Sequence, residues 1–262
     1  MRSAEWNTPR DDGDPATSVV RRMSALLGAF GPKDTVLGVN ELARRTAIPK
    51  ATVSRLVKEM EGIGFLERNG AKLGLGLRLF ELGQRASRRR SVREVALPFM
   101  ADLREATGQT IHLAVLDGTE VVYVEILRGR NAPRFPSAVG RRLPAHANGV
   151  GKALLARSAS EVVDAAIAKG LARVGPRTIT TPGTLRRQLK WIASSGIAYE
   201  HEESAPGVAC VASAIGVDDG PPVAAISASG WIGKVDIRRV GPAVHTAALS
   251  IARDLAVAAP QP

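Results

Sequence analysis

Cysteine is nearly absent from this chain of 262 residues, in which Cys210 is the single example. One cysteine cannot form an intramolecular disulfide, and it cannot supply the Cys-x-x-Cys pairs of zinc ribbons and thiol redox centres. Aromatic residues are also scarce, at 4%. The sequence contains no run of ~18 consecutive apolar residues, and its N-terminus lacks the apolar core of a signal peptide. These absences predict a cytoplasmic protein with no membrane partner.

Positive charge is what the chain has in excess, with 36 Lys and Arg against 25 Asp and Glu. The excess is uneven, because residues 16–90 hold 15 basic and 6 acidic side chains whereas residues 91–262 hold 19 and 15. Binding to a polyanion requires cations clustered on one surface. The distribution therefore predicts a polyanion-binding N-terminal part joined to a nearly neutral part, although a solvated basic surface would give the same counts.

The N-terminal part begins with residues 1–16, whose mixture of Asp, Pro, Gly and Arg has no apolar period and predicts a disordered tail. Apolar residues then recur at helical spacing in three segments, and Asn69-Gly70 is a strong hairpin signal between two short β-rich runs. Three helices followed by a small basic hairpin predict a winged helix-turn-helix domain over residues 17–76. The helices are predicted over residues 18–30, 39–45 and 49–61.

The third of these helices carries short polar and basic side chains on the face opposite its apolar stripe. A helix in the DNA major groove needs such side chains to reach base edges and phosphates. A solvated amphipathic helix would look similar, but the preceding helix, the short turn and the basic hairpin favour DNA binding. Arg44 and Arg45 are as consistent with capping the second helix as with phosphate contact. The predicted DNA-binding residues are Lys50, Thr52, Ser54, Arg55, Lys58, Arg68 and Lys72.

Residues 77–91 are predicted to form a linker helix, which ends in three arginines that are either solvated or an added phosphate contact. From residue 92 onwards, β-rich runs alternate with helical segments. This order predicts an α+β domain over residues 92–260, an antiparallel sheet with helices packed on it. The predicted strands are 109–116, 120–127, 197–200, 208–217 and 222–230, and the predicted helices are 92–108, 146–157, 160–169, 182–196 and 238–257.

The segment HANGVGKALL, residues 146–155, enters its helix through two glycines. It is not a P-loop, because His146 stands where the first glycine is required and Ala153 follows the lysine in place of a hydroxyl residue. Two interpretations remain. The N–H groups of residues 149–151 could receive the carboxylate of a small organic acid at the start of the helix, or the glycines could serve only for close packing in a tight turn.

Cys210 lies in the middle of a predicted strand, where a cysteine is most simply a small buried hydrophobe. A nucleophilic cysteine needs a base beside it, and no histidine has a spacing that places it near Cys210. The histidines also lack the spacings of metal sites, so we predict no catalytic residue, no metal and no cofactor. An enzyme that uses Cys210 with His146 or His201 is the competing hypothesis, and thiol reactivity would distinguish the two.

Two serines and a group of carboxylates flank the Cys210 strand. Ser227 and Ser229 are two residues apart on an apolar strand and therefore point to the same face. Buried hydroxyls need hydrogen-bond partners, which a bound ligand could provide. Glu200, Glu202 and Glu203 precede the strand; one of them could face a pocket, although carboxylates at a strand end usually face solvent.

Several stretches together resemble the IclR family of transcriptional regulators. They are ELARRTAIPKATVSRLVKEMEGIGFLER, LGLGLRLFELG, LPAHANGVGKALLA and GIAYEHEESAPGVACVASAIG with AAISASG after it. The resemblance implies a cytoplasmic bacterial repressor or activator, with a winged helix-turn-helix head and a GAF/PAS-like effector domain, and not an enzyme. It implies binding to a palindromic double-stranded DNA operator as a homodimer or a dimer of dimers, and a response to a small carboxylated or aromatic metabolite.

The resemblance also implies a set of effector-binding residues, which overlaps the glycine turn, the cysteine strand and the serine pair found above. The chain departs from the family pattern at Ala71, where the wing usually has an aromatic residue, and at Ala214, where a proline is usual. Asn148 and Gly149 make the turn more polar than usual. A domain that serves only for oligomerisation remains a third hypothesis. The predicted effector-binding residues are Gly149, Val150, Gly151, Glu200, Cys210, Ser227 and Ser229.

Overall fold

The computed structural model describes residues 18–31, 34–85, 87–130, 137–216 and 220–258 of the chain. They belong to two compact units, Met1–Ser87 and Arg88–Pro262. The tail predicted to be disordered, residues 1–16, lies outside the described residues. None of the helices in the described ranges is long and apolar enough to cross a membrane.

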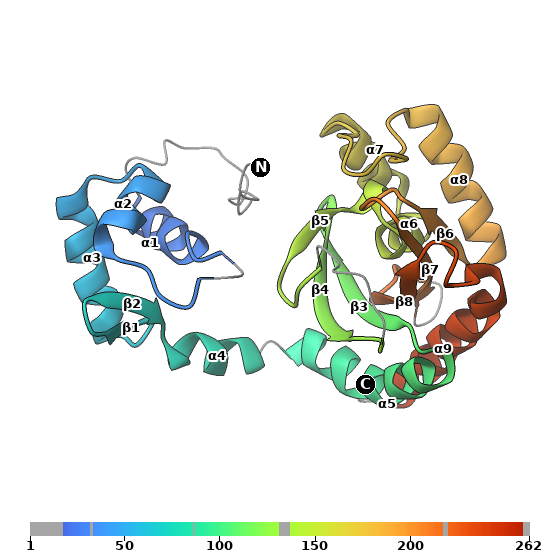
Figure 1. The fold of residues 1–262 in the computed structure, drawn as a ribbon, viewed down its shortest axis with the longest axis horizontal. Coiled ribbons are helices and arrows are strands. Elements are labelled where there is room, and N and C mark those ends of the chain that lie inside the picture. The colour runs from blue at the N-terminus through green and yellow to red at the C-terminus, as the bar shows by residue number, and fades with distance from the viewer. Residues whose placement is uncertain (1–17, 32–33, 86, 131–136, 217–219, 259–262) are drawn as a thin grey trace. The chain divides into compact units, whose positions relative to one another are not determined.

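The first unit contains the predicted three helices and hairpin (Figure 1). Their apolar stripes converge on one core, which explains why short helices of marginal intrinsic stability hold together. The loop before the second helix joins the hairpin through paired backbone bonds between Leu37 and Leu73, each 2.8 Å long. The elements are α1 Val19–Gly28, α2 Val39–Thr46, α3 Lys50–Gly62, β1 Leu66–Asn69 and β2 Lys72–Leu75.

The single linker helix predicted over residues 77–91 is instead divided between two helices. Helix α4 spans Leu77–Gln84, and α5 spans Ser87–Thr107, so the predicted helix from residue 92 begins earlier than expected. Gly83 lies in the last turn of α4, where a glycine weakens a helix because its backbone loses the most freedom on ordering. None of the α4 residues is buried within the chain.

The second unit is built on a six-stranded antiparallel sheet with the order β5-β4-β3-β8-β7-β6. This arrangement confirms the predicted α+β fold with an antiparallel sheet. A short strand, β5, was not predicted. The strands are β3 Thr110–Asp117, β4 Glu120–Leu127, β5 Arg142–Pro144, β6 Ala198–His201, β7 Val208–Ile215 and β8 Ala224–Trp231.

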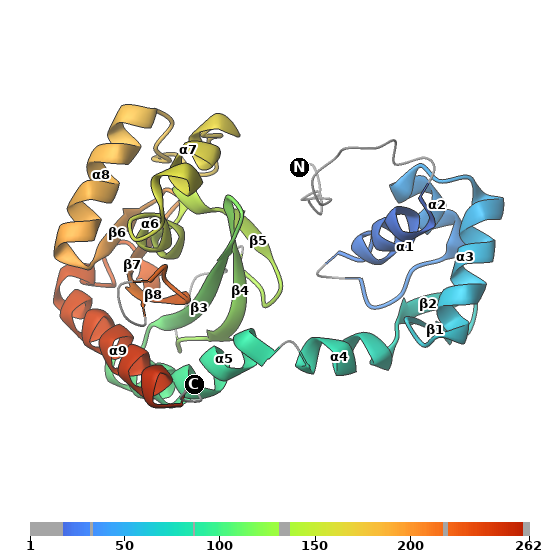
Figure 2. The same ribbon diagram turned by 180° about the vertical axis from the view of Figure 1, so that it is seen from behind.

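Helices cover both faces of this sheet (Figures 1 and 2). Helices α5 and α9 (Ile237–Ala258) lie on one face, and α6 (Gly149–Leu155), α7 (Ser160–Ala168) and α8 (Pro182–Ser195) lie on the other. The predicted helix over residues 146–157 is shorter than expected, because a turn of 3-10 helix at Ala145–Ala147 precedes α6.

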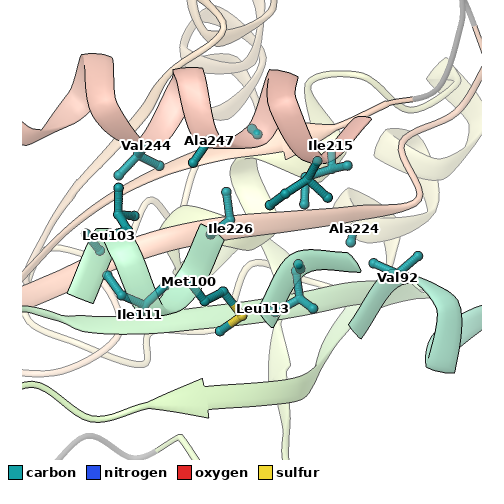
Figure 3. Packing of buried hydrophobic residues seen from close by; sticks show 14 of the residues in the cluster. Val92, Met100, Leu103, Ile111, Leu113, Ile215, Ala224, Ile226, Val244 and Ala247 are labelled. Carbon is teal, nitrogen blue, oxygen red and sulfur yellow. The ribbon is translucent and has the colours of Figure 1, made fainter. Parts of the chain in front are cut away.

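Strand alternation separates the two cores. In β3, Ile111 and Leu113 point to the core under α5 and α9, which also contains Met100 and Val244 (Figure 3). Ala114 points to the opposite core with α6. Because side chains alternate along a strand, His112 faces α6 as well, and the same rule directs Cys210, Ser227 and Ser229 to that face.

Candidate functional sites

The outer face of α3 presents a set of uncompensated cations. Lys50, Ser54, Arg55 and Lys58 are exposed and Thr52 is half-buried, whereas the opposite face, with Val53, Leu56, Val57 and Met60, is buried. In the described parts of the chain, Lys50, Arg55 and Lys58 form no ion pair. Their charge is therefore available to a polyanion.

The turn between α2 and α3 sets the orientation of this face. Ala47 ends α2 in the left-handed conformation, with φ of 56°, which is uncommon for a residue other than glycine. Pro49 then precedes the first turn of α3, a position where a missing N–H is tolerated. A helix, a tight turn and a second helix with a polar outer face form the arrangement that enters the DNA major groove.

Among the residues that the structure describes, the wing has one basic side chain without an ion pair, Lys72, and one with an ion pair, Arg68. Lys72 is exposed. Arg68 forms a forked contact with Glu61 at the end of α3, from Nε to Oε1 and from Nη2 to Oε2, both 2.8 Å. The Glu61 carboxylate raises the pKa of Arg68 and offsets its charge. Arg68, predicted to contact DNA, thus links the wing to α3 in this structure.

The basic end of α2 is offset in the same way. Arg44 donates to Glu41 at 2.6 and 2.9 Å, and Arg45 donates to Glu41 at 2.7 Å and also contacts Asp34. Of the two interpretations left open for these arginines, the structure supports a structural role at the helix end.

A small cavity lies between the sheet and the start of α6. Its volume is about 20 Å³. Six of the seven predicted effector-binding residues line it: Gly149, Val150, Glu200, Cys210, Ser227 and Ser229. The seventh, Gly151, does not; an added Cβ there would lie 2.1 Å from the carbonyl oxygen of Ala145, so this glycine permits close packing.

Strand register brings the lining residues together. Glu200 of β6 is paired with Cys210 of β7, and Cys210 is paired with Ser229 of β8. Ser227 of β8 is paired with His112 of β3. Side chains directly opposite one another on antiparallel strands are about 5 Å apart, so the sheet presents a row of polar groups to the cavity.

Glu200 is held at the start of α6. Its side chain is buried, with 2% of the residue exposed. The amide of Gly149 donates to Oε2 at 2.9 Å, and the amide and hydroxyl of Ser204 both donate to Oε1. An added Cβ at Gly149 would lie 2.9 Å from Sγ of Cys210, so only glycine permits this approach.

Two of the three N–H groups predicted to bind an effector carboxylate, those of Gly149 and Gly151, have protein partners in this structure. The amide of Gly149 is already bound to Glu200, and the amide of Gly151 donates to Oδ1 of Asn148 at 2.8 Å. The side chain of Asn148 also donates to the carbonyl of Pro144 at 2.8 Å. Protein groups therefore cap this helix, and a ligand carboxylate there would meet the carboxylate of Glu200.

The other titratable groups at the cavity are held neutral. Burial lowers the pKa of His112 to about 3 and raises the pKa of Tyr123. His112 contacts the hydroxyl of Ser137 through Nε2 at 2.9 Å and that of Ser229 through Nδ1 at 3.5 Å. At neutral pH these side chains can therefore take part in hydrogen bonds but carry no charge.

Cys210 has the environment of an unreactive thiol. Burial raises its pKa to about 12, so very little thiolate is present near neutral pH. His146 is engaged with the carbonyl of Ala172 at 3.0 Å, and His201 is exposed. This environment disfavours the competing hypothesis of a cysteine nucleophile. Within the described ranges, no group of three or more His, Cys, Asp or Glu side chains could hold a metal ion.

Some lining residues were not predicted from the sequence. His112, Tyr123, Ser137 and Ser204 all face the cavity. The signal for His112 was present, because a histidine within the apolar run TIHLAVL needs a polar partner in the interior. Glu203, expected to face solvent, is also buried.

Two family models match this chain. Residues 19–70 match the IclR helix-turn-helix domain, and residues 84–256 match the C-terminal domain of the bacterial transcriptional regulator IclR. The chain is 36% identical over 196 residues to the transcriptional repressor AllR of Klebsiella pneumoniae, covering 73% of this chain and 72% of AllR. It is 31% identical over 225 residues to the regulator XynR of Escherichia coli, covering 85% and 89%.

Solved structures agree with these matches. An IclR homologue from Microbacterium hydrocarbonoxydans, crystallised with 4-hydroxybenzoate, is 33% identical with a TM-score of 0.86 and covers 92% of this chain and 100% of its own. The IclR of Thermotoga maritima is 27% identical with a TM-score of 0.74 and covers 90% and 98%. The chain therefore belongs to the IclR family of transcriptional regulators, with a DNA-binding helix-turn-helix domain and a ligand-binding C-terminal domain.

Proposed function

We propose that this regulator binds a palindromic operator as a homodimer or a dimer of dimers and that a small hydroxylated aromatic or carboxylated metabolite controls it from the α6 cavity. The observation that carries the effector part is the buried polar row of Glu200, Cys210 and Ser229 across three strands. Burying a polar group costs free energy unless the group is hydrogen-bonded. A row of buried polar groups along one cavity therefore supports a ligand that forms hydrogen bonds there.

On the DNA side, the proposal is supported by the exposed cations of α3 and by the exposed Lys72 of the wing. A single α3 reads only a few base pairs, whereas two copies related by two-fold symmetry read two half-sites about one helical turn apart. We expect sedimentation of the chain with an operator duplex to give an even number of protomers per duplex. One protomer per intact operator would contradict the proposal. Because its target is DNA, we expect the protein to act in the bacterial cytoplasm.

The lining chemistry indicates what kind of ligand the cavity takes. Glu200 is a hydrogen-bond acceptor that faces the cavity, so it suits a ligand hydroxyl such as a phenol. Ser227 and Ser229 offer hydroxyl donors, which suit a ligand carboxylate or carbonyl at the other end. A hydroxylated aromatic acid combines both groups, and the homologue crystallised with 4-hydroxybenzoate makes this compound the first probe.

The cavity must open for such a ligand to enter. An aromatic ring needs a cavity on the order of 150 Å³, whereas about 20 Å³ is open here. A ligand that binds only the opened arrangement shifts the population towards it, and a ligand that bound both arrangements equally would shift nothing. The small cavity therefore supports a sensor whose ligand binding is coupled to rearrangement of the C-terminal domain.

Titration calorimetry tests the ligand assignment. We expect 4-hydroxybenzoate to bind the full chain more tightly than benzoate, which lacks the hydroxyl that Glu200 would accept. Glu200→Gln should narrow that difference. The double variant Ser227→Ala/Ser229→Ala should lose roughly tenfold or more in affinity, because two hydrogen bonds are removed.

The exposed Ser194 of α8 provides the matched control, and Ser194→Ala should leave the affinity unchanged. Equal binding by the Ser227→Ala/Ser229→Ala variant and the parent would remove the cavity from the proposal. Failure of the parent to bind any hydroxylated aromatic or carboxylated compound would favour the hypothesis that the domain serves only for oligomerisation.

A further inference from the structure

A lysine side chain is completely buried beside the α6 cavity. Lys152 of α6 is 0% exposed, and its ammonium group donates to the carbonyl of Tyr199 at 2.9 Å and to Oε1 of Glu203 at 2.5 Å. The Glu203 side chain is itself only 8% exposed. Lysine and glutamate are almost never fully buried unless they are paired, so this ion pair needs an explanation.

Stability does not explain the pair. Taking two charges out of water offsets most of their mutual attraction, and apolar side chains of similar volume often serve as well or better. Oε2 of Glu203 is buried and has no hydrogen-bond partner among the described residues. Desolvation accordingly raises the pKa of Glu203. Because one buried oxygen of the pair has no hydrogen-bond partner, the pair is not optimised for stability. Its role is therefore indicated by its position in the fold.

The two contacts of Lys152 fall on either side of Glu200. Tyr199 precedes Glu200 in β6, and Glu203 follows it in the turn to β7. Lys152 thereby fastens residues 199–203 to α6, one helical turn beyond Gly149, whose amide binds the Glu200 carboxylate. The lysine and the glycine amide thus hold the same short segment from one helix.

A neighbouring loop braces the backbone of the same turn. The hydroxyl of Thr178 donates to the carbonyl of Glu203 at 2.6 Å, and the amide of Arg177 donates to the carbonyl of Glu202 at 3.1 Å. These contacts shape the turn, but they do not connect it to α6. The Lys152 ammonium makes that connection through a backbone carbonyl and a side chain together.

We propose that Lys152, through its contacts with Tyr199 and Glu203, is a positioning residue of the effector site that holds the Glu200 carboxylate against the Gly149 amide. The proposal deepens the proposed function, because Glu200 is the acceptor offered there to the ligand. A lysine is suited to this task because its ammonium group can donate to a carbonyl and a carboxylate at once. An apolar side chain of the same volume would fill the space and fix neither.

The variant Lys152→Met/Glu203→Leu separates positioning from stability. Single replacements would leave one buried charge unpaired and destabilise the domain, whereas replacing both removes the charges together. We therefore expect the double variant to keep a melting temperature close to that of the parent. Glu203→Gln alone is the second variant, should the double replacement not fold. It leaves the Lys152 charge without a carboxylate and should lower the melting temperature, but it keeps the side-chain shape, an oxygen that can accept from Lys152, and the contact between Lys152 and Tyr199.

The first readout needs no ligand. Amide hydrogen exchange of Gly149, measured by NMR on the full chain, reports whether Glu200 still accepts its hydrogen bond. Glu200→Ala provides the reference and should accelerate this exchange at least roughly tenfold, as expected for loss of a hydrogen bond to a charged group. The double variant should show a similar acceleration, and Glu203→Gln a smaller one.

Ser213→Ala is the matched control, because it removes the hydrogen bond that a buried hydroxyl of β7 donates to the carbonyl of Gly196. It should lower the melting temperature and leave Gly149 exchange unchanged. An unchanged Gly149 amide in a well-folded Lys152→Met/Glu203→Leu variant would overturn the proposal. So would an unchanged amide in Glu200→Ala, because Glu200 would then not be held there.

The second readout is affinity for 4-hydroxybenzoate. If Lys152 acts through Glu200, Lys152→Met/Glu203→Leu should weaken binding roughly tenfold, and adding Glu200→Gln should cause little further loss. If the affinity losses caused by Lys152→Met/Glu203→Leu and by Glu200→Gln add fully, the ion pair affects binding independently of Glu200. That result would overturn the positioning role. If the parent binds no such ligand, the effector assignment fails while the exchange experiment still decides the role of Lys152.

Discussion

Arg55 and Arg68 were both predicted to contact DNA, yet within the described ranges Arg55 forms no ion pair whereas Arg68 is paired with Glu61. Each protein cation that neutralises a DNA phosphate contributes about 0.9 to the slope of log affinity against log salt. Arg55→Ala should therefore lower that slope by about 0.9. It should also weaken binding to a short mixed-sequence duplex roughly tenfold at low salt, the loss expected for a hydrogen bond to a charged group.

Arg68→Ala should change the slope by less than half as much, because Glu61 already offsets the charge that the variant removes. Conversely, Glu61→Gln removes the carboxylate that offsets Arg68 and leaves this arginine available to a DNA phosphate. The slope should then rise by up to about 0.9, the value for one further phosphate contact. Between about 50 and 200 mM salt, a slope of 0.9 corresponds to about a 3.5-fold change in affinity, which fluorescence anisotropy resolves.

Arg253→Ala is the matched control, since it removes the same charge from an exposed position in the other unit. Its slope should equal that of the parent. Equal slope losses in Arg55→Ala and Arg68→Ala would refute the reasoning that the forked ion pair withholds Arg68 from DNA. An unchanged slope in Arg55→Ala would remove the outer face of α3 from the interface.

Three further predictions concern the C-terminal domain. Gly149→Ala should lower the free energy of unfolding by about 1–3 kcal/mol through overpacking against Cys210. Adding Cys210→Ala should restore most of the lost stability. A melting temperature unaffected by Gly149→Ala would contradict the close approach of Gly149 to Sγ of Cys210. Alkylation of Cys210 should be slow at neutral pH and rise about tenfold per pH unit up to pH 10, because its thiol pKa is about 12; a plateau near pH 7 would revive the nucleophile hypothesis. The pKa of His112 falls to about 3 on folding, so between pH 6.5 and 3 the imidazole is protonated in the unfolded chain and neutral in the folded one. The free energy of unfolding should therefore decline by about 1.4 kcal/mol per pH unit as the pH falls from 6.5 towards 3. His112→Gln should flatten that decline in denaturant titrations, and an equally steep decline would show that other groups cause it.

Local patterns predicted the elements of both units well. The i, i+3, i+4, i+7 spacing of Val53, Leu56, Val57 and Met60 predicted α3, and all four side chains are buried. Asn69-Gly70 predicted the hairpin between β1 and β2. The linker was less well predicted, because apolar residues in 77–91 show where a helix can form but give no indication of a break between α4 and α5.

The predicted cavity residues came partly from the family resemblance and partly from strand alternation. Alternation placed Ser227 and Ser229 on one face, but it did not reveal that His112 lies opposite Ser227, since that depends on how β3 pairs with β8. Nor could spacing show that Glu203 is buried against Lys152, because a carboxylate at a strand end is exposed or buried according to the helix that packs over it.

The sequence alone therefore determined the helix-turn-helix, the order of strands and helices, and the outward cations of α3, because these follow from interactions among residues within a few positions of one another. Only the tertiary structure decided which of the predicted DNA-binding cations form an ion pair and which groups hold the start of α6. Glu61 takes up Arg68, Glu200 occupies the Gly149 amide, and Lys152 fixes the segment that carries Glu200. The physical reason is that hydrogen bonds and ion pairs are satisfied by the nearest partner in space, and the nearest partner of Gly149 lies 51 residues away along the chain.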